Sequence, residues 1–235
     1  MNKKIICMIP VRIGSTRLKL KNLALVNGKP LVYYSIKSAK DSLIFDNIFV
    51  NSDDILLKKI TDRYNIDFYK RPKKLGGNNI KSDEVVANFL YKNNCDILVW
   101  VNSIAPLQKS QEISEIVKYF SSSNYDSLYT VIDRKVHAIL NNKSLNFNKK
   151  VKFQQTQELE PIKEMVYSLM MWKSKKFIKN YEKYGNAFLR GKIKYYNVGI
   201  NHSFIVKNID DLNIIDTIMK SKDKKFNLKY DRIIK

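Results

Sequence analysis

The sequence has few of the residues that build disulfides or metal centres. Its 235 residues include two cysteines and two histidines. Cys7 and Cys95 lie far apart within apolar runs, and neither His137 nor His202 has a partner at a metal-ligand spacing. We therefore expect both thiols to be buried structural groups in a protein of a reducing compartment.

Long hydrophobic runs are also missing. The apolar run behind the basic start is only about six residues, which is too short for the core of a signal peptide. No stretch approaches the roughly 20 apolar residues that span a bilayer. These absences predict a cytoplasmic protein with no membrane partner. The hydrophobic fraction of 44% nevertheless predicts a packed core, and the length suits one domain over residues 1–235.

Acidic residues are scarce, with 22 against 43 basic ones and a formal net charge of +21. Such a charge first suggests nucleic acid as a partner. The lysines are spread over nearly every segment, whereas nucleic-acid-binding proteins gather theirs on one face. Nucleic acid is therefore not the partner that we expect, although it stays an alternative. Anionic small molecules such as nucleotides suit this charge better.

Apolar strands and amphipathic helices alternate along the first half of the chain. The pattern predicts strands at 4–10, 47–52, 66–70, 96–101 and 125–133, and helices at 27–42, 53–65, 82–93 and 110–123. Asp53 and Ser82 suit the start of two of these helices. Such alternation predicts a parallel sheet that binds its ligand at the carboxyl ends of the strands. The site would then lie among the loops 10–22, 51–54, 71–82 and 101–108.

Residues 134–192 follow no clear period. A polar stretch precedes an apolar run at 165–172 that reads as exposed, so this excursion is predicted to form a dimerisation arm or a lid. The chain then returns to a strand at 192–198. A last helix is predicted at 209–220, capped by Asp210 or Asp211. The basic tail that follows is not assigned a role.

The loop "IPVRIGSTRLKLKN", residues 9–22, gathers cations directly behind the first strand. Gly14 would let the backbone approach a ligand, and Arg12, Arg17 and Lys21 would neutralise phosphate charge. The P-loop and dinucleotide-binding glycine motifs are both absent. Charge alone leaves two readings open, a triphosphate cradle and a solvated surface loop.

Together with "VNGKPLVYYSI" that follows it, this loop resembles the opening of the cytidylyltransferases that activate sugar acids. These are the acylneuraminate (CMP-sialic acid) cytidylyltransferases and the related CMP-Kdo synthetases. The stretch from "NSDD" to "RPKKLGG" extends the resemblance, which fades toward residue 220.

The resemblance implies a Rossmann-like, mostly parallel α/β sheet flanked by helices, of the nucleotide-diphospho-sugar transferase type, in a homodimer. It implies transfer of CMP from CTP to a sialic-acid-like or related keto-sugar acid, with release of pyrophosphate. Matching positions give the triphosphate site as Arg12, Gly14, Ser15, Arg17 and Lys21, with Arg12 and Lys21 as catalytic cations. They give the ribose and cytosine contacts as Asn22, Arg71 and Ser82, and the acceptor contacts as Asn102, Gln108 and Gln157.

The acidic half of the family pattern is altered. The resemblance implies Mg²⁺, but Ile205 and Lys207 stand where the metal-binding acids of the family belong. Asp210 and Asp211 remain as candidate ligands, but their position suits an N-cap, which favours helix capping as their role. The leading hypothesis is an active cytidylyltransferase. The alternative is a catalytically impaired relative that binds a nucleotide or an acidic sugar.

Overall fold

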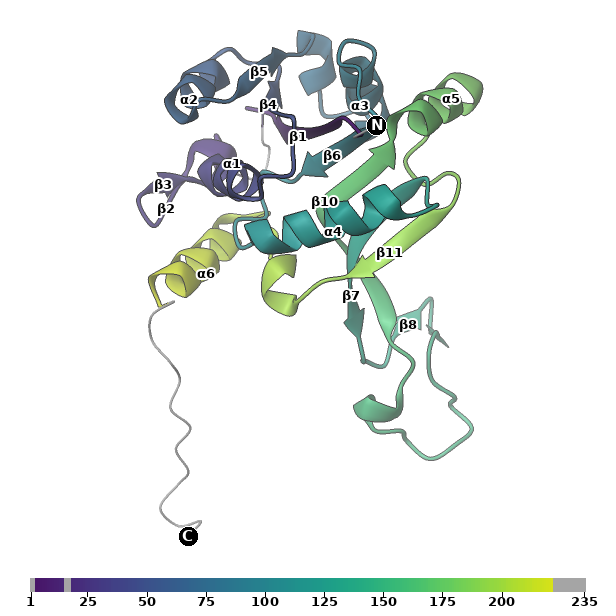
Figure 1. The fold of residues 1–235 in the computed structure, drawn as a ribbon. Coiled ribbons are helices and arrows are strands. Elements are labelled where there is room, and N and C mark those ends of the chain that lie inside the picture. Colours follow the sequence, from purple (N-terminus) through teal and green to yellow (C-terminus); the bar gives the residue numbers. More distant parts are fainter. Residues whose placement is uncertain (1–2, 15–17, 222–235) are drawn as a thin grey trace.

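The computed structural model describes residues 3–14 and 18–221, which fold around one seven-stranded sheet (Figure 1). The strand order is β11-β7-β10-β6-β1-β4-β5, and within this sheet only β10 runs antiparallel to its neighbours. The strands are β1 (Ile5–Val11), β4 (Asn47–Ser52), β5 (Asp67–Lys70), β6 (Ile97–Val101), β7 (Ser127–Arg134), β10 (Ile162–Lys173) and β11 (Ile193–Asn197). The predicted mostly parallel α/β sheet is confirmed.

Helices cover both faces of the sheet. They are α1 (Leu31–Asp41), α2 (Leu56–Tyr64), α3 (Ser82–Leu90), α4 (Ser110–Ser122), α5 (Ser174–Tyr184) and α6 (Ile209–Lys220). Successive side chains of β1 point to opposite faces. Cys7 and Ile9 therefore pack with residues of α1 and α4, whereas Ile6 and Met8 pack with residues of α3 and α5. No helix in the described part of the chain is long and apolar enough to cross a bilayer.

Short elements connect the main ones. They are η1 (Lys21–Leu23), β2 (Leu25–Val26), β3 (Lys29–Pro30), η2 (Lys73–Gly76), β8 (Ile139–Leu140), β9 (Lys143–Ser144), η3 (Thr156–Glu158) and η4 (Ile200–Ser203). Cys7 and Cys95 are free and buried, as predicted, and burial raises the pKa of both thiols.

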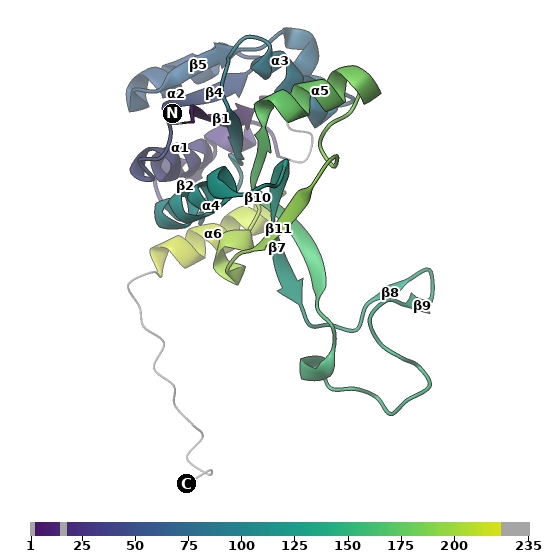
Figure 2. The same cartoon turned by 45° about the vertical axis from the view of Figure 1, so that its right-hand side comes forward.

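The prediction of an exposed apolar run at 165–172 is wrong. This run belongs to β10, which pairs with β6 on one side and with β7 on the other. Residues 168–172 are buried, so their apolar character reflects a strand covered on both faces. Within the described part of the chain, residues 135–161, between β7 and β10, extend away from the body of the molecule and carry the β8–β9 hairpin (Figures 1 and 2). A role of this extension in dimerisation stays a prediction.

Two predicted helix caps are wrong. Helix α2 begins at Leu56, whose N–H donates to Asp54, and Asp53 instead pairs with a buried arginine. Helix α3 does begin at Ser82, as predicted, and the Lys81 N–H before it donates to the Glu84 carboxylate.

Helix α6 is capped by Asn208 and not by Asp210 or Asp211. The Asn208 side chain accepts from the Asp211 N–H at 2.9 Å, and the Asp211 carboxylate accepts from the Asn208 N–H at 3.0 Å. This reciprocal arrangement is a capping box.

Candidate functional site

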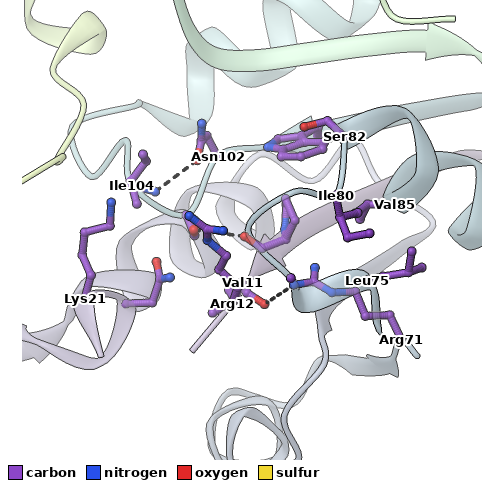
Figure 3. A pocket seen from close by; sticks show the side chains of 15 residues that line it. Val11, Arg12, Lys21, Arg71, Leu75, Ile80, Ser82, Val85, Asn102 and Ile104 are labelled. Carbon is purple, nitrogen blue, oxygen red and sulfur yellow. Dashed lines mark hydrogen bonds between the residues drawn. The ribbon is translucent and has the colours of Figure 1, made fainter. Parts of the chain in front are cut away.

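A cavity of about 320 Å³ opens at the carboxyl ends of the central strands (Figure 3). Its wall includes residues from the loop after β1, from η1, from the loop after β5, from the start of α3 and from the loop after β6. The predicted site residues among them are Arg12, Lys21, Asn22, Arg71, Ser82 and Asn102. The predicted loops 10–22, 71–82 and 101–108 thus line one cavity at the strand ends, whereas none of residues 51–54 lines it.

Two cationic side chains line this cavity from the basic loop. The Arg12 guanidinium donates to the Asn78 side-chain oxygen at 3.0 Å. The Lys21 ammonium donates to the backbone carbonyl of Val206 at 3.0 Å, which joins the loop to the segment before α6. Figure 3 shows Arg12 between Lys21 and Arg71 in this view. Both cations are placed to meet an anion that enters the cavity.

Three residues of the cavity wall have a buried side-chain polar atom with no hydrogen-bond partner among the described residues. The atoms are the side-chain oxygen of Asn22, Nε of Arg71 and the indole Nε1 of Trp100. Leaving a buried polar group unpaired costs about 1–3 kcal/mol. An acceptor and two donors left open in one cavity wall are groups that a polar ligand could satisfy.

Arg71 organises the wall more than it reaches into the cavity. Its guanidinium donates to the carbonyls of Val11 and Asn51, both at 3.2 Å, and to the Asp53 carboxylate at 2.9 Å. The side chain is 4% exposed, and burial lowers its pKa although Asp53 acts against this shift. Arg71 therefore ties the loop after β5 to the ends of β1 and β4.

A second cavity, of about 830 Å³, adjoins the first. The two share wall residues, namely Lys21, Ser82, Trp100, Asn102 and Ile104. The rest of the second wall comes from Lys81 and Asp83 at the start of α3, from β7, from β10, from the loop after α5 and from the segment between β11 and α6. A ligand in the first cavity and a ligand in the second would thus contact the same wall residues.

A β-bulge in β10 forms part of the second wall. The register between β10 and β7 shifts between Met165 and Met170, and Tyr167 has a φ of +55°. Left-handed backbone is strained for such a side chain. Asn102 holds the bulge, because its N–H donates to the Ser168 carbonyl at 3.0 Å and its amide donates to the Tyr167 carbonyl at 3.1 Å. Bulges next to sites commonly re-aim a side chain, and Tyr167 lines the cavity.

Comparison with known proteins agrees with this geometry. The profile of the cytidylyltransferase family matches residues 6–191. The chain belongs to the cytidylyltransferase family. An N-acylneuraminate cytidylyltransferase of Streptococcus agalactiae serotype V is 34% identical over 142 residues, which are 58% of this chain and 34% of that protein. This chain thus spans about a third of the length of that relative.

Two further comparisons cover nearly the whole chain. The post-translational flagellin modification protein B of Campylobacter coli is 25% identical over 237 residues, covering 94% of this chain and 97% of that protein. The solved structure of a CMP:2-keto-3-deoxy-manno-octonic acid synthetase complexed with CTP matches with a TM-score of 0.69 at 13% identity, covering 93% and 99% of the two chains. At this identity the structural likeness shows the shared fold alone.

Some of the predicted site residues do not meet at the two cavities. Gln108 is buried, and its amide contacts Glu112 at the start of α4. Gln157 is exposed in η3, on the extension. Gly14 is exposed and lines neither cavity, and the predicted contacts Ser15 and Arg17 lie outside the described residues.

The described residues do not fit a metal centre built by the protein. No group of three or more histidine, cysteine or acidic side chains in 3–14 and 18–221 could hold an ion. The Asp211 carboxylate accepts from the N–H groups of Lys207 and Asn208, and neither Asp210 nor Asp211 lines either of the two cavities described above. Lys207 itself lines the second cavity.

Trp100 and Tyr167 were missed by sequence reasoning. Trp100 lies in β6, where its apolar neighbours make it read as one more core residue. Its place near the carboxyl end of a central strand was the available signal. Tyr167 offered no such signal, because its position follows from a bulge that interrupts an apolar run.

Proposed function

We propose that this chain transfers CMP from CTP to a sialic-acid-like or related keto-sugar acid and releases pyrophosphate. The observation that carries the proposal is the pair of adjoining cavities in a member of the cytidylyltransferase family. The first has cations and open polar groups for a nucleotide, and the second has room for an acceptor beside it.

In this reaction the anomeric hydroxyl oxygen of the acid attacks the α-phosphorus of CTP. The bond to the oxygen that bridges to the β-phosphorus breaks, pyrophosphate leaves with the electron pair, and the hydroxyl proton is lost. Such chemistry needs alignment and charge stabilisation more than covalent help from the protein. We assign the charge on the triphosphate to Arg12 and Lys21, with Gly14, Ser15 and Arg17 as further predicted contacts.

We assign the ribose and cytosine to the wall that holds Asn22 and Ser82. The open oxygen of Asn22 accepts a hydrogen bond from a nucleotide N–H or O–H there. We assign Arg71 a positioning role, in which it holds the cavity wall in place, because its Nη atoms already donate to the protein. Asn102 stands at the junction of the two cavities and is assigned to the acceptor side.

The test is pyrophosphate release by purified protein with CTP, Mg²⁺ and a panel of keto-sugar acids. Release must depend on both CTP and an acid, and ATP in place of CTP is the matched control. Absence of release with every acid would overturn the proposal.

A second candidate is a catalytically impaired relative that binds nucleotide or acidic sugar. The lack of an acidic cluster among the described residues favours it. Calorimetric titration separates the two functions. Affinity for CTP that does not change with Mg²⁺, together with no turnover, would support the binding protein.

The proposal extends to the setting of the reaction. Mg²⁺ remains the expected cofactor, and a cytoplasmic location remains the expected one. The extension 135–161 supports the proposed homodimer, because it carries exposed apolar side chains such as Ile139, Leu140 and Phe153. Light scattering of the whole chain and of Phe153→Ser measures the mass. A monomer at micromolar concentration would contradict assembly.

A further inference from the structure

The segment before α6 brings a lysine to the second cavity. Ile205 and Lys207 stand where the metal-binding acids of the family belong. Both residues line the cavity, whereas Val206 between them is fully buried. The altered positions therefore lie at the site itself, and the change from an acid to a lysine reverses the charge that this segment gives to the wall.

The backbone of the segment is fixed to two neighbouring parts of the site. The Val206 N–H donates to the Ile104 carbonyl at 2.9 Å, and the Val206 carbonyl accepts from the Lys21 ammonium at 3.0 Å. Ile104 and Lys21 both belong to the wall that the two cavities share. The Lys207 N–H donates to the Asp211 carboxylate at 2.6 Å. The Lys207 side chain thus starts from a fixed point beside the junction of the cavities.

The acidic side chains at the two cavities already have partners. Among the described residues, the acids that line them are Asp83 and Glu164. The Asp83 carboxylate accepts from the N–H groups of Ala187 and Phe188, at 2.6 and 2.9 Å. Glu164 pairs with Arg134 at 2.8 Å. These two carboxylates do not form a metal site, which agrees with the lack of any such cluster in 3–14 and 18–221.

The Lys207 ammonium, by contrast, is available to a ligand. Its side chain is exposed, and it forms no ion pair with any residue that the structure describes. An ammonium group is a compact charge on a flexible stem, so it can follow an anion that enters the cavity.

The proposed reaction brings two anions together. In the ring form of a keto-sugar acid, the anomeric carbon carries both the hydroxyl that attacks and the carboxylate. This carboxylate must therefore approach the α-phosphate of CTP, and the repulsion between them raises the barrier unless a cation neutralises it. A cation on the acceptor side of the junction meets this need.

We propose, on the basis of the proposed function, that Lys207 binds the carboxylate of the acceptor acid. It supplies there the positive charge that a divalent ion held by acidic side chains would otherwise supply. The protein then holds no divalent ion of its own, and Mg²⁺ accompanies CTP through the phosphates of the nucleotide.

The first experiment measures KM for N-acetylneuraminate, or for the fastest acid of the panel, and KM for CTP. Lys207→Gln removes one charge-assisted contact, so KM for the acid should rise about tenfold or more while KM for CTP stays unchanged. Lys207→Arg keeps the charge and should recover most of this loss. Lys118→Gln removes a charge from an exposed position on α4 outside both cavities, and this matched control should behave like the parent.

The second experiment has a readout apart from turnover. Mn²⁺, which takes the same oxygen ligands as Mg²⁺, is titrated into the parent chain without nucleotide and followed by electron paramagnetic resonance. We expect no saturable binding at millimolar concentrations of the ion. Stoichiometric binding would overturn the claim that the protein holds no ion of its own.

The failure of this inference and the failure of the proposed function are distinguishable. Turnover in the parent with an unchanged KM for the acid in Lys207→Gln overturns the role of Lys207, while the proposed function stands. If no acid reacts, the proposed function fails, and calorimetry with N-acetylneuraminate decides on Lys207. Weaker binding to Lys207→Gln than to Lys118→Gln supports its role, whereas equal binding or none overturns it.

Discussion

The pair formed by Arg71 and Asp53 gives the sharpest prediction about how the site is held. Asp53→Asn removes the carboxylate that faces a guanidinium with only 4% exposure. Removing one partner of a buried ion pair costs about 3–5 kcal/mol. The Asp53 side chain is 17% exposed and Asn keeps an acceptor, so water and the amide recover part of this cost. We expect a loss of about 2 kcal/mol in the free energy of unfolding.

Urea unfolding followed by tryptophan fluorescence measures this loss. Asp62→Asn is the matched control, because Asp62 pairs with Lys58 at 2.8 Å on the exposed face of α2. An exposed pair of this kind contributes a few tenths of a kcal/mol at most. The affinity for CTP should also fall in Asp53→Asn, since Arg71 joins three strand ends at the cavity. Equal stability of the two variants would refute the structural role given to Arg71.

Three further predictions concern the cradle, a glycine and pH. Arg12→Ala and Lys21→Ala should each weaken CTP binding about tenfold or more in calorimetry, because a charge-assisted contact is worth roughly 1.5–3 kcal/mol. Unchanged affinity in both variants would show that the nucleotide binds elsewhere. Gly76→Ala should lower the melting temperature, because a Cβ there would collide with the Asp53 carboxylate, and a melting temperature equal to that of the parent would contradict this packing. Burial raises the pKa of Cys7 above its ordinary value of 9.0 and also raises the pKa of Tyr129. Both groups are buried in the protonated form. Their contribution to the free energy of unfolding is therefore complete below pH 9 and is lost as the pH rises, by about 1.4 kcal/mol per pH unit and group at most. The urea midpoint of unfolding should therefore decrease as the pH rises above 9, and it should decrease less steeply in Cys7→Ala. A midpoint that increases with pH would contradict this prediction.

The first half of the fold could be predicted from the sequence because local patterns and the final packing agree there. The strand at 47–52 has the predicted limits, and the strand at 4–10 differs by one residue at each end. Each lies in a regular alternation with helices, so apolar period and turn position point to the same answer.

The prediction failed where tertiary contacts decide. The apolar run at 165–172 became part of a central antiparallel strand because it fills the space between β6 and β7, and no local pattern encodes those partners. Asp53 resembles a helix cap in the sequence, but its carboxylate accepts a hydrogen bond from the buried guanidinium of Arg71, 18 positions later. A capping pattern cannot reveal such a long-range partner.

The candidate site was predicted unevenly for the same reason. Arg12, Lys21 and Asn22 follow one strand in a motif of fixed spacing, and the structure places them in one cavity. Gln108 was assigned from the same kind of matching, yet its side chain turns to Glu112. The wall of the second cavity depends on a bulge and on loops from the second half of the chain, whose positions follow only from the assembled sheet.

The most direct measurement of the central claim is the release of pyrophosphate from CTP by the purified chain, with and without a keto-sugar acid. The account predicts release that requires the acid, that yields the CMP-linked acid in equal amount and that falls in Lys21→Ala. Binding of CTP without release in the presence of any acid would contradict it.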